Sequence, residues 1–66
     1  MPRGKVKWFN KERHFGFIIQ ENGKDIFFHQ NDVANGLVLK EGQEVEFEVE
    51  RSPKGPKAVH VRPLLP

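Results

Sequence analysis

The chain has 66 residues, a net charge of +2 and no cysteine. A domain this small buries only about 60% of its unfolded surface, which excludes a large core. The lack of cysteine excludes disulfides and thiolate metal sites. No apolar run is long enough to span a membrane, and residues 1–4 do not begin a signal peptide. We therefore expect one cytoplasmic domain that covers residues 1–66.

The first half of the chain is predicted to form three strands. They are expected at residues 5–10, 15–20 and 25–30, in segments rich in valine, isoleucine and phenylalanine. Asn22 and Gly23 lie between the second and third strands, and this pair favours a type I′ hairpin turn because both residues accept positive φ angles. The second and third strands should therefore pair in antiparallel fashion.

The second half is predicted to begin with a helical turn and a fourth strand. Residues 31–36 can form one tight helical turn with Asn31 or Asp32 as its N-cap. Residues 44–50 alternate glutamate with apolar residues, which predicts a strand with one buried face. The residues expected on that buried face are Val45, Phe47 and Val49.

The end of the chain is predicted to complete the sheet. Residues 52–57 contain two prolines and a glycine and should form a rigid turn. Residues 58–62 follow as the fifth strand, with Val59 and Val61 facing inward. An open sheet of five short strands would leave exposed edges, and closure into a barrel removes them. The expected fold is an all-β, five-stranded antiparallel barrel.

Apolar and aromatic side chains fall on both faces of the third strand. Ile26 and Phe28 share one face, whereas Phe27 lies on the other between Asp25 and His29. Burying that second face would be costly unless its carboxylate and imidazole were paired. We therefore expect the face of Ile26 and Phe28 inside. The residues that hairpin pairing would place beside Phe27, on the outer face, are Phe15 and Phe17.

A core without these outer rings still fills a small barrel. Its expected members are Val6, Ile18, Ile26, Phe28, Val33, Leu39, Val45, Phe47, Val49, Val59 and Val61. Each phenylalanine taken alone is more typical of a core. Burying Phe15, Phe17 and Phe27 would nevertheless expose the apolar residues that alternate with them. A contiguous aromatic patch on the outside indicates a binding surface.

The charge around the aromatic segment indicates the kind of ligand. Residues 1–14 and 51–66 are predominantly basic, whereas residues 41–50 contain five glutamates. Flat rings stack on unstacked bases and cations contact phosphates, a combination that suits single-stranded nucleic acid. Each stacked base contributes about 1–3 kcal/mol, and screened surface charges add less. Charge blocks on a merely solvated surface are the simpler alternative.

Several segments together resemble the cold-shock domain, the family of bacterial cold-shock proteins and eukaryotic Y-box domains. The segments are GKVKWFN (4–10), RHFGFI (13–18), DIFFH (25–29), EGQEVEFEV (41–49) and KGPKAVHV (54–61). The segment RHFGFI is similar to the first ribonucleoprotein motif, and IFFHQ is similar to the second. The resemblance covers almost the whole chain, and the order of the motifs makes it specific.

The resemblance implies an oligonucleotide-binding (OB-fold) barrel that holds single-stranded RNA and DNA with little sequence preference and acts as an RNA chaperone. The residues implied for base stacking are Trp8, Phe15, Phe17, Phe27 and His29. The residues implied for polar or ionic contacts are Lys7, Asn10, Arg13, Asp25 and Lys54, with Lys5 and Phe9 flanking them. No enzyme activity, cofactor, metal, membrane or small-molecule substrate is implied, and we expect a monomer.

The chain departs from the bacterial pattern at three places. His14 stands where glycine is usual. If the position needs a positive φ, the backbone of His14 is strained; if it does not, His14 could add a ring or a charge to the binding site. Gln30 replaces an aromatic residue. Residues 31–42 are shorter than the bacterial loop and carry Leu37 and Val38 in place of its stacking aromatic. We therefore expect weaker binding or a shorter footprint than in a typical bacterial member.

Two other interpretations of the outer rings stay open. An SH3-like barrel would bind proline-rich peptides in an aromatic groove, although such grooves favour tyrosine and this chain has none. A barrel that binds no ligand would cover Phe15, Phe17 and Phe27 with a partner chain. Asp25 also has two interpretations, since it could accept a hydrogen bond from a base edge or close the hairpin turn.

Overall fold

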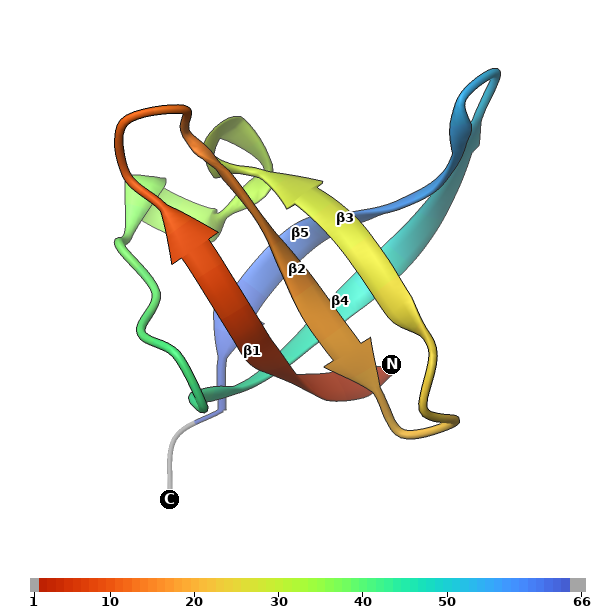
Figure 1. The fold of residues 1–66 in the computed structure, drawn as a ribbon, viewed down its shortest axis with the longest axis horizontal. Coiled ribbons are helices and arrows are strands. Elements are labelled where there is room, and N and C mark those ends of the chain that lie inside the picture. The colour runs from red at the N-terminus through yellow and green to blue at the C-terminus, as the bar shows by residue number, and fades with distance from the viewer. Residues whose placement is uncertain (1, 65–66) are drawn as a thin grey trace.

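The computed structural model describes residues 2–64, which form five strands and two short 3₁₀ turns (Figure 1). The strands are β1 (Arg3–Asn10), β2 (Phe15–Gln20), β3 (Asp25–His29), β4 (Glu44–Ser52) and β5 (Gly55–Pro63), and the 3₁₀ turns are η1 (Gln30–Asp32) and η2 (Ala34–Gly36). The strands close into a barrel in the order β1-β2-β3-β5-β4. The expected all-β barrel is thus confirmed. Among residues 2–64, no helix has the length and hydrophobicity needed to cross a membrane.

One strand pairing in the barrel is parallel. β3 and β5 run in the same direction, with Phe27 beside Lys57 and Phe28 beside Ala58. The other pairings around the described barrel are antiparallel. A closed ring of five strands cannot alternate direction all the way round, because five is an odd number. The structure therefore differs at this pair from the antiparallel arrangement expected from the sequence.

The core fills the barrel and matches the predicted set with two differences. Its buried members are Val6, Ile18, Ile26, Phe28, Val33, Leu39, Val45, Phe47, Ala58, Val59 and Val61. Ala58 is buried in addition to the predicted set, and Val49, which belongs to the predicted set, is 45% exposed. β4 pairs with β1 only over residues 44–46, so farther along β4 no strand covers this side. The alternating pattern identified the inward face of β4 correctly but could not show how far along β4 other strands bury that face.

The hairpin between β2 and β3 differs from its predicted form. The Gln20 N–H donates to the Lys24 carbonyl and the Gly23 N–H donates to the Gln20 carbonyl, both at 2.9 Å. Gly23 has a φ of +86°, whereas Asn22 does not have a positive φ. A type I′ turn needs positive φ at both central residues, so the expected turn type is wrong and the loop has three residues.

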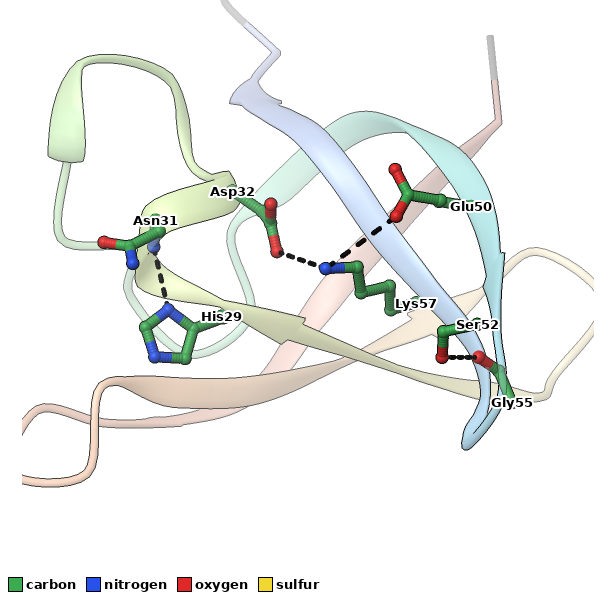
Figure 2. A network of polar contacts seen from close by, with 7 residues as sticks. All are labelled: His29, Asn31, Asp32, Glu50, Ser52, Gly55 and Lys57. Atoms are coloured by element: carbon green, nitrogen blue, oxygen red, sulfur yellow. Dashed lines mark hydrogen bonds and ion pairs between the residues drawn. The ribbon is translucent and has the colours of Figure 1, made fainter.

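The hairpin between β4 and β5 is tighter than expected. Ser52 pairs with Gly55, which leaves Pro53 and Lys54 as a two-residue loop in place of the predicted turn over residues 52–57. The Ser52 hydroxyl donates to the Gly55 carbonyl at 2.6 Å (Figure 2). This hairpin projects well beyond the barrel wall (Figure 1), and its tip carries a lysine.

Two 3₁₀ turns replace the single helical turn predicted over residues 31–36. The N-cap of η1 is His29, whose ring nitrogen Nδ1 accepts a hydrogen bond from the Asn31 N–H at 3.1 Å (Figure 2). The prediction that Asn31 or Asp32 would be the cap is wrong, because an imidazole nitrogen takes the place of their oxygen atoms. This contact needs an unprotonated Nδ1, so neutral His29 carries its proton on Nε2.

Candidate nucleic-acid interface

A β-bulge in β1 decides which of its two aromatic residues faces outward. Val6 pairs with Ile18 and Trp8 pairs with Phe17, so Lys7 has no partner on β2. The extra residue reverses the alternation of the strand. Trp8 therefore follows Lys7 onto the outer side of the barrel, and the inward position passes to the next residue.

Phe9 takes that inward position. It pairs with Gly16, which in turn pairs with Phe28, and the Phe9 and Phe28 rings stack with centroids 5.7 Å apart and planes 14° apart. A β-carbon at Gly16 would touch the Phe28 ring at 3.0 Å and collide with the Trp8 carbonyl oxygen. Phe9 thus packs against the core while staying partly exposed, and its place among the candidate ligand contacts stays a prediction.

Four rings form a continuous patch on the outer side of β1, β2 and β3, which we name the aromatic face. Its members are Trp8, Phe15, Phe17 and Phe27, with His29 at its edge. Trp8 lies 5.6 Å from Phe15 and 5.2 Å from Phe17, and Phe27 lies 5.7 and 5.8 Å from the same two rings. Each ring is half-buried, so neighbours hold it in place while part of it stays open to solvent. The predicted outward direction of the three phenylalanines is confirmed.

An ion pair lies beside the aromatic face, between β1 and β3. The Lys7 ammonium and an Asp25 carboxylate oxygen are 2.8 Å apart, and both side chains are largely exposed. Asp25 therefore holds a cation at the edge of the face. The hairpin turn closes through backbone hydrogen bonds of other residues.

The loop between β1 and β2 is closed by Asn10. Its side-chain oxygen accepts hydrogen bonds from the N–H groups of Glu12 and Arg13, at 2.9 and 3.1 Å. The Asn10 oxygen is thus engaged by backbone, while its amide nitrogen makes no hydrogen bond to a described residue. Arg13 is exposed in this loop, next in the chain to the strand that carries Phe15 and Phe17.

A second cationic region lies at the β4–β5 hairpin. One hollow of about 540 Å³ is lined by Lys54, Lys57 and Phe27 together with Glu50, Ser52, Gly55 and Pro56. The Lys57 ammonium is 3.7 Å from Asp32 and 4.0 Å from Glu50 (Figure 2), which compensates its charge. Lys54 forms no ion pair within the part of the chain that the structure describes. It is therefore the freer cation beside this edge of the aromatic face.

A third region, which we name the histidine hollow, lies at the other end of β2 and β3. It has a volume of about 580 Å³ and is lined by His14, His29, Gln30, Asn31, Val33 and Gly36. His14 has a φ of +60°, so the strained alternative considered for this position applies. Its ring also lines the hollow, which means that it adds a side chain to the site as well.

Sequence reasoning did not place Gln30, Asn31 and Gly36 in a site, because they line the hollow only once η1 and η2 fold back toward the β1–β2 loop. The Gln30 N–H donates to the His14 carbonyl at 2.8 Å and ties these segments together. The one signal in the sequence was the presence of glutamine and histidine where the related family has aromatic residues or glycine.

The opposite charge gathers on β4. Glu44, Glu48 and Glu50 are exposed along this strand, and Glu46 forms an ion pair with Arg62 at 2.8 Å. The aromatic face lies on β1–β3, so its rings and these glutamates occupy different strands of the barrel, and Asp25 is a carboxylate beside the rings on β3. Within residues 2–64, no group of histidine, aspartate and glutamate side chains could hold a metal ion.

Comparison with known proteins identifies the barrel. The family model of the 'Cold-shock' DNA-binding domain matches residues 2–64. The chain belongs to the cold-shock domain family. It is 51% identical to the probable cold shock protein A of Mycolicibacterium smegmatis, over 97% of this chain and all of that protein. It is 50% identical to a major cold shock protein of Streptococcus pyogenes, over 97% and 98% of the two chains.

A more distant cold-shock relative covers nearly the same length. The cold shock-like protein of Thermotoga maritima is 47% identical over 91% of this chain and 94% of its own. The family is one of nucleic-acid-binding domains and not of enzymes. The family therefore gives this cold-shock domain a ligand class, nucleic acid, and the SH3-like alternative is set aside.

Proposed function

We propose that the protein binds single-stranded RNA and DNA by stacking bases on the aromatic face, with lysine and arginine side chains contacting the phosphate backbone. The observation that best supports this is the continuous set of four half-buried rings on one side of the barrel. An exposed apolar patch of this kind marks a binding surface. Its tilted rings suit flexible single strands, whose bases can turn individually, better than a rigid duplex.

Stacking would supply most of the affinity. One base on one ring contributes about 1–3 kcal/mol, whereas an exposed ionic contact contributes about 1 kcal/mol or less. Every base has a flat face, so stacking discriminates little among sequences. The low overall sequence preference that the family resemblance implies follows from this balance.

Charge would orient the strand along the face. Arg13 and Lys54 lie on either side of the rings and form no ion pair with a described residue, whereas Lys7 is shared with Asp25. The exposed Glu44 and Glu48 of β4 would repel phosphates and keep the strand on β1–β3, whereas Glu50 is paired with Lys57. Affinity should fall with salt, with a log–log slope of about −0.7 for each phosphate neutralised.

An RNA-chaperone role is part of the same proposal. The protein would bind open strands and shift the equilibrium between paired and unpaired RNA, without an energy source. We also propose that it acts in the cytoplasm, which the lack of cysteine suits, and as a monomer. Size-exclusion chromatography with light scattering should give the mass of one chain, and a dimer would instead favour the interpretation in which a partner covers the rings.

Titration of Trp8 fluorescence tests the proposal. A short oligothymidine strand should quench the indole strongly, because a base would lie against it, whereas the matching duplex should quench it little. Equal responses to strand and duplex, or none to either well above micromolar concentrations, would contradict it. Repeating the titration with longer strands measures the footprint, which we expect to be shorter than that of a bacterial member with an aromatic residue at the position of Gln30.

A further inference from the structure

The histidine hollow continues the aromatic face into a site that contains hydrogen-bonding groups. His29 pairs with Phe15 across β2 and β3 and also lines the hollow, so it belongs to both. Beyond it, the lining combines the polar groups of His14, Gln30 and Asn31 with apolar surface. A strand that follows the rings would therefore bring its next base to hydrogen-bonding groups, which the aromatic face itself does not offer.

Hydrogen bonds fix which atoms of His14 are available. The Gln30 nitrogen Nε2 donates to the Gly36 carbonyl at 3.2 Å, and because a carbonyl can only accept, this sets the orientation of the amide. The other amide atom, Oε1, lies 3.4 Å from Nδ1 of His14. An oxygen can only accept there, so this contact is a hydrogen bond when Nδ1 of a neutral His14 carries the proton. Its Nε2 is left as an acceptor with no partner among residues 2–64.

His29 offers the complementary group. Its Nδ1 accepts from the Asn31 N–H at 3.1 Å (Figure 2), so its Nε2 carries a proton that it can donate. The hollow thus presents one acceptor on His14 and one donor on His29. A backbone N–H sets the tautomer of neutral His29 directly. For neutral His14 the partner is Gln30, whose amide is bonded to a backbone carbonyl.

We propose that the histidine hollow binds one nucleobase of the bound strand by its hydrogen-bonding edge, and that His14 and Gln30 make this one position base-selective. The inference rests on the proposed function, since the base comes from a strand that is already stacked on the aromatic face. The four bases carry donors and acceptors in different orders along their edges. A fixed acceptor and donor therefore discriminates among them, which stacking does not.

The backbone of His14 supports a role for its ring. Its φ of +60° lies in the left-handed region, which glycine adopts without strain and a residue with a β-carbon does not. Residues held in such strained conformations cluster at functional sites. The imidazole at this position thus adds a group to the hollow that the turn itself does not need.

A base scan along an oligothymidine strand tests the inference. Each thymine is replaced in turn by adenine, cytosine or guanine, and the affinity of each labelled strand is measured by fluorescence anisotropy. The proteins compared are the wild type, His14→Gly, Gln30→Ala and His60→Gly. His60→Gly is the matched control, because His60 is also an exposed histidine with positive φ, at +52°, but lies on β5 outside the hollow.

We expect the wild type to discriminate among bases by about fivefold or more at one position, the lower end of what a base-edge contact gives. His14→Gly and Gln30→Ala should reduce that discrimination to within twofold, and His60→Gly should keep it. Tight binding with no selective position would overturn the inference and leave the proposed function standing. Selectivity that survives both variants would overturn its assignment to the hollow, and failure to bind any strand would overturn the proposed function itself.

Discussion

Replacing Phe17 with alanine tests directly whether the aromatic face binds bases. Phe17 lies between Trp8 and Phe27, at centroid distances of 5.2 and 5.8 Å. Its loss removes one stacking position, at a cost of about 1–3 kcal/mol, so the Kd for oligothymidine should rise about 5-fold to 150-fold. The change also removes two ring pairs of about 0.5–1.5 kcal/mol each, so the free energy of unfolding should fall by about 1–3 kcal/mol.

The assay must separate lost affinity from lost stability. Anisotropy of a labelled oligothymidine, well below the unfolding temperature, reports binding without depending on the environment of Trp8. The matched control is Ile18→Val in the neighbouring residue, which is fully buried inside the barrel. It should lower the free energy of unfolding by about 0.5–1.5 kcal/mol and leave the Kd unchanged. The reasoning is refuted if Phe17→Ala changes the Kd less than twofold, or if both variants weaken binding equally.

Three other substitutions test single contacts. Asp25→Asn breaks the 2.8 Å ion pair and frees Lys7 for phosphate, so affinity at low salt should rise a few fold and its salt dependence steepen; an unchanged salt slope would contradict this. His14→Gly should raise the free energy of unfolding in urea by about 0.5–1 kcal/mol, because glycine adopts a positive φ without strain. A free energy of unfolding below that of the wild type would show that the His14 side chain stabilises the fold. Gly16→Ala should lower the free energy of unfolding by about 1–3 kcal/mol in thermal melts, since its β-carbon meets Trp8 and Phe28; an unchanged melting temperature would contradict the close packing at Gly16.

The sequence predicts the outer face of β3 well because alternation and polarity agree there, since Phe27 shares its face with Asp25 and His29. The face of β2 depends on the length of the loop as well. The predicted two-residue turn would pair Phe17 with Phe28, whereas the three-residue loop pairs Phe17 with Phe27. In β1 the rule of alternation fails. Strict alternation from Val6 would bury Trp8 and expose Phe9, whereas the bulge at Lys7 does the reverse. A bulge is defined by how two strands pair, so the sequence of one strand alone contains no pattern that predicts it.

Contacts between distant segments were also beyond sequence reasoning. The ring of His14 meets Gln30, 16 positions away, only when two loops fold toward each other. The cap of η1 could not be predicted from residue preferences, because these favour asparagine or aspartate and the structure uses His29. Val49 shows the remaining kind of error, since an inward direction does not guarantee that another strand covers it.

The parallel pairing of β3 with β5 joins the binding surface to the closure of the fold at one residue. The whole aromatic face lies on residues 8–29, in strands joined by short hairpins. Closure requires Arg3 to meet Glu46 and Phe27 to meet Lys57, and the long intervening segments make these pairs entropically costly to form. Phe15 and Phe17 take part in neither closing pair, so substitutions there can change what the protein binds without altering a residue that closes the barrel, whereas Phe27 serves both.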